Sequence, residues 1–223
     1  ARSYCKGEYQ YTMNRCPLCP GVNNVVSDCG PQQCDILLIG EAPGKDENAK
    51  GVPFIGKTGA ELDGHYLPLA GLTRHECRIT NAVHCLPPGT GKLDYTDTKH
   101  AAMIRSCAET HLYRAIAECQ PRLIVPMGTA ACSLVPGLEL DMHWAFPFVW
   151  SVPGYGDVPI FPTFHPALGL HSNKEMLKLR NCFIRLKLYL ASRLHVPDNK
   201  YPTPDYTVVT TVGTQAVQTN RER

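Results

Sequence analysis

The chain has 223 residues, of which 43% are hydrophobic, and its formal net charge is +2 at pH 7. This length and hydrophobic content fit one globular domain with a sizeable core, and the nearly neutral charge neither requires nor excludes nucleic acid as a partner. No apolar run approaches the roughly 20 residues of a membrane-spanning helix, and no signal peptide is visible, so we expect no membrane association.

The chain contains eleven cysteines, which is a high number for its length. Disulfide frameworks are typical of secreted chains shorter than about 100 residues that carry an export signal. Because this chain is longer and shows no such signal, its cysteine content predicts a reducing intracellular compartment, the cytoplasm, in which some cysteines bind metal.

Apolar runs of strand length alternate with helical patterns along the chain. Strands are predicted at residues 36–39, 78–80, 123–126 and 159–164, and helices at 58–70, 98–119, 128–134 and 174–194. This alternation predicts an α/β fold, a three-layer αβα sandwich with a central, mainly parallel four-stranded sheet. The predicted domain covers residues 1–197. Residues 198–223, rich in Thr, Val, Pro and Gln, are expected to form an extended tail or linker.

Three of the predicted strands are followed by polar residues, namely Glu41, Asn81 and His165. Ligands of parallel sheets bind beyond the carboxyl ends of the strands, so these residues predict a binding site, with Phe54 on the loop after the first strand. The glycine-rich segments 40–44 and 51–56 would let the backbone approach a ligand closely. The lysine motif and the glycine spacing of nucleotide-binding loops are missing, which disfavours a nucleotide phosphate as that ligand.

Four cysteines form a candidate metal site. Cys16 and Cys19 make a C-x-x-C motif, Cys85 follows the second predicted strand, and Cys107 lies in the helix predicted at 98–119. Four thiolates can hold either an iron–sulfur cluster or a structural zinc ion, and the spacing leaves both open. Cys29 and Cys34 could compete as ligands.

Five stretches of the chain occur together in a recognisable order. They are "GEAPG" at 40–44, "GVPFIGKTGAELD" at 51–63, "GLTRHECRITNAVHCLPP" at 71–88, "PRLIVPMGTAA" at 121–131 and "FPTFHPAL" at 161–168. In this order they resemble the uracil-DNA glycosylase superfamily, and within it the family-4 enzymes, which carry a [4Fe–4S] cluster. The resemblance covers roughly residues 14 to 192.

The resemblance implies a monofunctional glycosylase of base excision repair, which hydrolyses the N-glycosidic bond of flipped-out deoxyuridine and leaves an abasic site. Phe54 would stack on the base, Asn81 would pair with uracil N3–H and O4, and His165 would donate to O2 as negative charge develops. Backbone groups of Gly40, Ala42 and Gly44 would line the substrate site. The resemblance leaves two roles open for Glu41, which would either position the water nucleophile or shape the turn.

The resemblance also implies a set of DNA contacts and selects the four cysteines as cluster ligands. Family-4 chains usually carry bulky leucines and an arginine after His-Pro-Ala, whereas this chain has Gly169 and His171 there. A weaker wedge would favour single-stranded or mismatched substrates, since extruding a base from a duplex costs a few kcal/mol. The predicted DNA contacts are Gly56, Lys57, Gly128, Pro166, Leu168, Leu170 and His171.

Two alternatives remain open at this point. One is a covalent uracil binder, although the loop at 86–100 lacks the Arg-Arg-Ile-His run of that branch. The other is a non-catalytic uracil-DNA binding module, such as the glycosylase-like part of a larger replication protein. In each case the expected partner is uracil-containing DNA, single-stranded or duplex, and the expected state is a monomer.

Overall fold

The structure is a computed structural model that describes residues 18, 24–88, 91, 93 and 97–192. The tail expected at 198–223 lies outside the described residues, as do Cys16 and Cys19. No helix in the described part of the chain is long and apolar enough to cross a membrane.

A five-stranded sheet with the order β2-β1-β3-β5-β4 forms the centre of the fold. Four mutually parallel strands correspond to the predicted ones, but the fourth, predicted at 159–164, lies at Gly156–Ile160. A fifth strand, β4, was not predicted; it pairs antiparallel with β5 at one edge of the sheet. The strands are β1 Ile36–Gly40, β2 Cys77–Asn81, β3 Leu123–Pro126, β4 Phe148–Val152 and β5 Gly156–Ile160.

Helices are present at the four predicted positions, and two short helices, Lys45–Lys50 and Leu140–His143, were not predicted. Ser172 caps the last of the four predicted helices, because its hydroxyl accepts a hydrogen bond from the Glu175 N–H at 3.3 Å. Two predicted long helices each contain a π-helical turn, at Leu62–Tyr66 and Ala108–Leu112. The α-helices are α1 Lys45–Lys50, α2 Lys57–Glu61, α3 Leu67–Leu69, α4 Thr98–Cys107, α5 Tyr113–Cys119, α6 Thr129–Cys132, α7 Leu140–His143 and α8 Asn173–Ala191.

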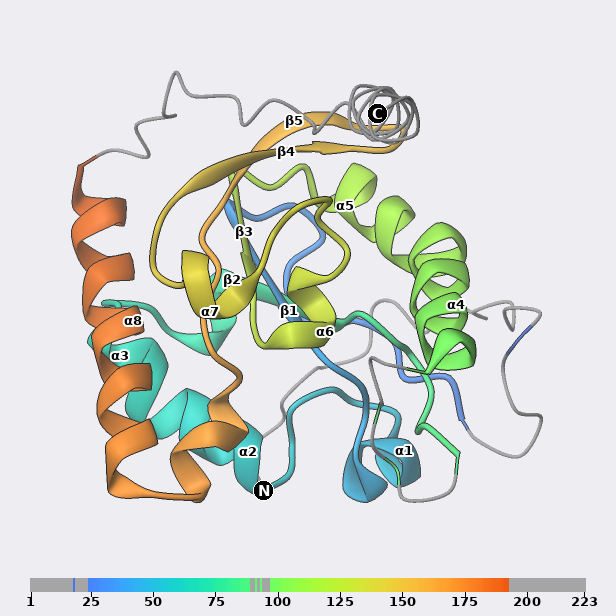
Figure 1. The fold of residues 1–223 in the computed structure, drawn as a ribbon, viewed down its shortest axis with the longest axis horizontal. Coiled ribbons are helices and arrows are strands. Elements are labelled where there is room, and N and C mark those ends of the chain that lie inside the picture. The colour runs from blue at the N-terminus through green and yellow to red at the C-terminus, as the bar shows by residue number, and fades with distance from the viewer. Residues whose placement is uncertain (1–17, 19–23, 89–90, 92, 94–96, 193–223) are drawn as a thin grey trace, which may run out of the picture.

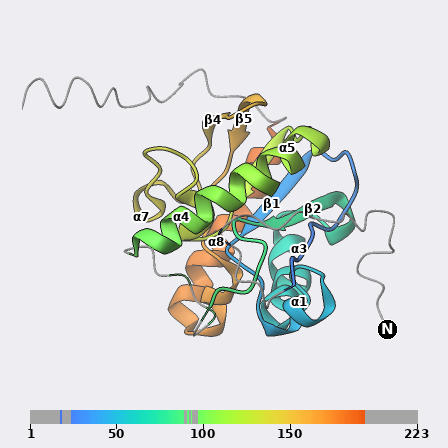
Figure 2. The same ribbon diagram turned by 90° about the vertical axis from the view of Figure 1, so that its right-hand side faces the viewer.

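Strand β1 is buried on both faces, as an internal strand of a three-layer fold requires. Leu37 and Ile39 point into a core that is shared with α4 and α5, whereas Ile36 and Leu38 point into a second core that is shared with α8. Figure 1 shows α8 and α3 on one side of the sheet and α4 and α5 on the other, and Figure 2 shows α4 and α5 crossing in front of it. The predicted αβα sandwich is therefore confirmed.

Residues 24–35, here called the N-terminal strap, run antiparallel beside β2. Cys29 and Ile79 exchange two backbone hydrogen bonds of 2.9 and 2.7 Å, and the Val26 N–H donates to the His84 carbonyl at 2.7 Å. Val25 forms a bridge with Cys85 beyond the strand end. The strap thus connects the start of the sheet with the loop that carries Cys85.

Candidate functional site

Four predicted site residues meet at the carboxyl ends of β1 and β2. Gly40 and Asn81, the last residues of these strands, face each other in the register of the sheet. The Phe54 ring packs so closely over Gly40 that a Cβ atom there would lie 2.5 Å from the ring and 2.6 Å from Asn81 Oδ1. The His165 ring lies 5.7 Å from the Phe54 ring, centroid to centroid. Gly40 is therefore required at this position by its neighbours.

Asn81 carries a hydrogen-bonding group that is left unused. The residue is only 3% exposed, and within the described part of the chain its Oδ1 has no hydrogen-bond partner. Burying a polar atom in this way costs about 1–3 kcal/mol. An unsatisfied acceptor beside an aromatic ring is a group that a ligand N–H can use.

His165 is held as a neutral imidazole with a defined tautomer. Its Nδ1 accepts a hydrogen bond from the Ala167 N–H at 3.3 Å, so the ring proton is on Nε2. Burial of the ring lowers the pKa of His165 to about 4. Gly128, at φ 86°, packs directly beneath it, where a Cβ atom would lie 2.8 Å from His165 Cβ. The side chain can therefore offer Nε2–H as a hydrogen-bond donor at neutral pH.

The Phe54 loop has a strained backbone that a buried arginine supports. Phe54 has φ 53°, a left-handed conformation that costs a non-glycine residue on the order of 1 kcal/mol. Arg74 is 8% exposed, and its guanidinium donates to the carbonyls of Phe54 at 3.0 Å and Pro53 at 2.6 Å. Asp63 balances its charge at 3.2 Å. These contacts fix the direction of the aromatic ring.

The carboxylate of Glu47 links the two glycine-rich segments by accepting backbone hydrogen bonds from both. One carboxylate oxygen accepts from the Gly44 N–H at 3.1 Å, and the other accepts from Ile55 at 3.0 Å and Gly56 at 2.8 Å. Arg74 and Glu47 were not predicted as site residues. The single local signal in the sequence was the acidic residue three positions after the cap of α1, Gly44.

Glu41 and Gly44 are placed on the turn after β1. The Glu41 carbonyl accepts a hydrogen bond from the Val83 N–H at 3.0 Å, which fixes the backbone of this turn against the end of β2. Its carboxyl side chain is partly exposed. The Gly44 N–H donates to the Glu47 carboxylate, so this group stabilises the turn after β1 and is not directed at a substrate.

The predicted DNA contacts lie around the 3-10 turn Pro166–Leu170 and the start of α2. Leu170 is 48% exposed and His171 is exposed beside it, whereas Pro166 is buried. Leu168 is partly buried. Lys57 is exposed at the first position of α2, directly after Gly56. Leu170, His171 and Lys57 are therefore the members of this set that can reach a partner.

Gly169 does not replace a wedge residue, contrary to the prediction. A Cβ atom at this position would collide with the hydroxyl of Tyr66 and would lie 3.6 Å from Leu179. The position therefore faces the interior, and a leucine there would not point toward DNA. The predicted preference for single-stranded or mismatched DNA loses the argument on which it was based.

Two of the predicted cluster cysteines lie in the same corner of the fold. Cys85 and Cys107 are 3% and 2% exposed, and the backbone N–H of His84, the neighbour of Cys85, donates to Cys107 Sγ at 3.1 Å. His84 Nδ1 lies 3.5 Å from the same sulfur. Among the described residues no group of three or more His, Cys, Asp and Glu side chains could hold a metal ion.

This corner suits thiolate ligands. N–H donors directed at a cysteine sulfur are the outer-shell contacts that stabilise the ligands of iron–sulfur clusters. Cys34, one of the two alternative ligands, contacts the backbone N–H of Arg78 at the start of β2, whereas Cys85 follows the other end of that strand. Cys34 therefore belongs to a different region of the molecule.

Known proteins are similar to this chain over most of its length. The sequence profile of the uracil DNA glycosylase superfamily matches residues 27–187. A type-4 uracil-DNA glycosylase of Saccharolobus solfataricus is 30% identical over 83% of this chain and 85% of its own length. The chain belongs to the type-4 branch of this superfamily. Type-4 enzymes of Archaeoglobus fulgidus and Thermotoga maritima are each 31% identical, over 70% and 73% of the chain and 77% and 80% of their own lengths.

The hydrogen bonds from Gly44, Ile55 and Gly56 to the Glu47 carboxylate yield a first prediction for this type-4 chain. In Glu47→Gln the amide can no longer accept on both sides, so it turns an NH2 group toward either Gly44 or Ile55. We expect Phe54 to lose its fixed position and kcat/KM on uracil-containing DNA to fall roughly 10- to 100-fold. Steady-state kinetics of Glu47→Gln beside Asp46→Asn, a neighbouring control, would measure this, and equal values for both variants would contradict it.

His165 yields a prediction about stability against pH. Its pKa is about 4 in the fold, compared with 6.5 for an ordinary histidine. The unfolded chain therefore binds more protons between these values, and stability that is fully present above pH 6.5 declines as the pH falls toward 4.

Urea unfolding at pH 7 and pH 4 measures this effect. We expect the free energy of unfolding of the wild type to decrease by on the order of 1–3 kcal/mol more than that of His165→Asn. Other titrating groups are common to both proteins and cancel in the difference. An equal decrease in the free energy of unfolding of the two proteins would show that the pKa of His165 is not lowered in the fold.

Proposed function

We propose that the protein is a uracil-DNA glycosylase that hydrolyses the N-glycosidic bond of a deoxyuridine flipped out of DNA. The observation that carries the proposal is the buried, unpartnered Oδ1 of Asn81 beside the rings of Phe54 and His165. Its membership of the type-4 branch and the names of its relatives support the same activity. The product would be an abasic site for base excision repair.

Base recognition follows from the hydrogen-bonding groups of Asn81. Its Oδ1 would accept from uracil N3–H, and its amide NH2 would donate to O4. Cytosine presents an acceptor at N3 and a donor at C4, so both contacts would become repulsive. Phe54 would stack on the base, a contact worth about 1–3 kcal/mol for any base, which is why selectivity rests on Asn81.

Stabilisation of the leaving group is the proposed task of His165. As the glycosidic bond breaks, negative charge develops on uracil O2, and a donor fixed at that point favours the transition state over the ground state. A neutral imidazole with its proton on Nε2 supplies such a donor without first having to lose or gain a proton. Water would be the nucleophile, with Glu41 either positioning it or shaping the turn.

DNA would reach the site past the exposed residues beside it. Lys57 would contact phosphate, and Leu170 and His171 would contact the strand beside the extruded base. All the side chains of the proposed site come from one chain, so a monomer suffices. We further infer a reducing, cytoplasmic location, because a thiolate-bound cluster requires reduced cysteines.

We infer that Cys16, Cys19, Cys85 and Cys107 hold a [4Fe–4S] cluster, with structural zinc as the alternative. The buried pair Cys85 and Cys107 and the N–H donated to Cys107 support this assignment. Val25 is the bridge partner of Cys85, and Cys19 precedes it by six residues. A chain segment of that length is long enough to bring Cys19 to Cys85. When bound, the cluster would act structurally by tying the start of the chain to the loop after β2.

The activity is tested with a labelled oligonucleotide that contains one uracil, under single-turnover conditions. After alkali treatment the wild type should yield a shortened strand, and Asn81→Ala should react at least about 100-fold more slowly. Asn173→Ala, an exposed asparagine on α8, serves as the matched control. An unshortened strand with wild-type protein would indicate a binding module, and a strand retarded with protein attached would indicate a covalent binder.

The cluster is tested by elemental analysis and visible absorption of the purified protein. We expect brown protein with iron and acid-labile sulfide in equal amounts, lost in Cys107→Ala and kept in Cys132→Ala, which removes a buried thiol elsewhere. Zinc in place of iron and sulfide would overturn the cluster assignment while leaving the four-cysteine site intact. Metal content unchanged in Cys107→Ala would overturn the site itself.

A further inference from the structure

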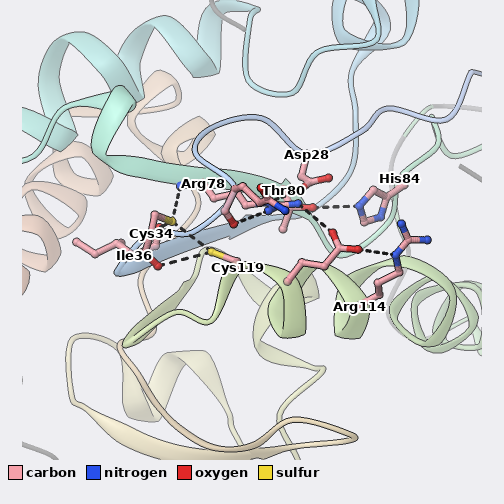
Figure 3. A network of polar contacts seen from close by, with 10 residues as sticks. Asp28, Cys34, Ile36, Arg78, Thr80, His84, Arg114 and Cys119 are labelled. Atoms are coloured by element: carbon pink, nitrogen blue, oxygen red, sulfur yellow. Dashed lines mark hydrogen bonds and ion pairs between the residues drawn. The ribbon is translucent and has the colours of Figure 1, made fainter. Parts of the chain in front are cut away.

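Two cysteines face each other at the end of the sheet opposite the proposed catalytic site. The sulfur atoms of Cys34 and Cys119 lie 3.2 Å apart, although the residues are 85 positions apart in the sequence. Figure 3 shows the two sulfurs directed at one another beside Arg78. We propose that Cys34 and Cys119 are a thiol–disulfide exchange site, which forms a reversible disulfide with a low-molecular-weight disulfide such as oxidised glutathione as oxidant.

The backbone already brings the two residues to the separation that a disulfide needs. The Cys34 N–H donates to the Cys119 carbonyl at 3.3 Å, which fixes the strap against the end of α5. A disulfide bond is about 2.05 Å long, so the sulfurs must approach by roughly 1 Å. Rotation of the two side chains is the movement that would bring the sulfurs into bonding distance.

The two thiols differ in a way that assigns their roles. Cys34 is partly exposed, and hydrogen bonds from the Cys119 thiol and the Arg78 N–H lower its pKa to about 7 against the opposing effect of burial. Cys119 is 1% exposed, and the hydrogen bond to Cys34 together with burial raises its pKa. Cys34 is therefore the attacking thiol and Cys119 the resolving thiol.

Other cysteines of the core lack this activation. Burial raises the pKa of Cys77 and Cys132 to about 12 and that of Cys182 to about 11. Their thiols remain protonated and inaccessible at neutral pH, and they serve as internal controls for reactivity.

The exchange proceeds in two balanced steps. The Cys34 thiolate attacks one sulfur of oxidised glutathione, forming a mixed disulfide and releasing one glutathione thiolate. Cys119 then loses its proton and attacks Cys34 Sγ, which forms the protein disulfide and releases the second glutathione. Two cysteine thiols are oxidised, one glutathione disulfide is reduced to two thiols, and reduced glutathione reverses both steps.

The position of the pair indicates what the disulfide would do. Arg78, buried under the strap, pairs with Asp28 of the strap, donates to the Gln32 carbonyl at 2.8 Å, and lies 3.6 Å from Glu118 of α5. A Cys34–Cys119 bond would add a covalent link between the same two segments. The site lies before the amino end of β1, whereas Asn81 ends β2, so the inference does not depend on the proposed function.

The experiment equilibrates the purified holoprotein, without oxygen, in buffers with increasing ratios of oxidised to reduced glutathione. Free thiols are then blocked by alkylation, and peptides are analysed by mass spectrometry. We expect a linked peptide pair that contains Cys34 and Cys119, and a rise in Tm of the oxidised protein of about 5–10 °C. Reduced wild type, Cys34→Ser and Cys119→Ser should excise uracil at equal rates.

Matched variants keep the outcome decisive. Cys132→Ala should show the same oxidised link and Tm rise as the wild type, whereas Cys34→Ser and Cys119→Ser should show neither. If one serine variant fails to fold, the other still reports on the pair. Full alkylation of both cysteines at every ratio, glutathione retained on Cys34 without a link, or a link to another cysteine would each overturn the proposal.

Discussion

The buried guanidinium of Arg74 is the interaction on which the site depends most. It holds the backbone of Phe54 in a left-handed conformation that the residue would not adopt alone, by donating to two consecutive carbonyls. Asp63 neutralises the charge, so the pair can remain inside the protein. Removing one partner of a fully buried ion pair typically costs about 3–5 kcal/mol, and this pair is largely shielded from water. The aromatic platform is thus held by electrostatics as well as by packing.

The site combines several features that each reduce stability. Phe54 is strained, Asn81 leaves an acceptor unsatisfied, and His165 is kept neutral in a partly buried position. Such arrangements persist where the surrounding structure enforces them and a ligand uses them. Here two carboxylates and one guanidinium, on Glu47, Asp63 and Arg74, supply that enforcement. The donors and acceptors are therefore in place before a base arrives, and need not reorganise during the reaction.

The sequence was sufficient for those features that are set by local pattern. The apolar run before Gly40 predicted β1, and polar residues after three runs correctly placed Asn81 and His165 on one edge of the sheet. Strand β4 was missed because the burial of its residues alternates only weakly, so its sequence carries no clear strand period. Glu47 and Arg74 were missed because most of their partners are backbone groups, which residue types do not reveal. Gly169 was misread for a related reason, since only packing against Tyr66 shows which way that position faces.

The N-terminal strap has a consequence for how this protein behaves among other copies of itself. Strand β2 is the outermost parallel strand, and a bare outer strand is a template for pairing with another chain. Two hydrogen bonds between Cys29 and Ile79 pair the backbone groups at the middle of β2, so these groups cannot bind another chain. The same residues that connect the sheet to the Cys85 loop thereby shield the sheet against edge-to-edge aggregation, so solubility and site assembly depend on one short segment.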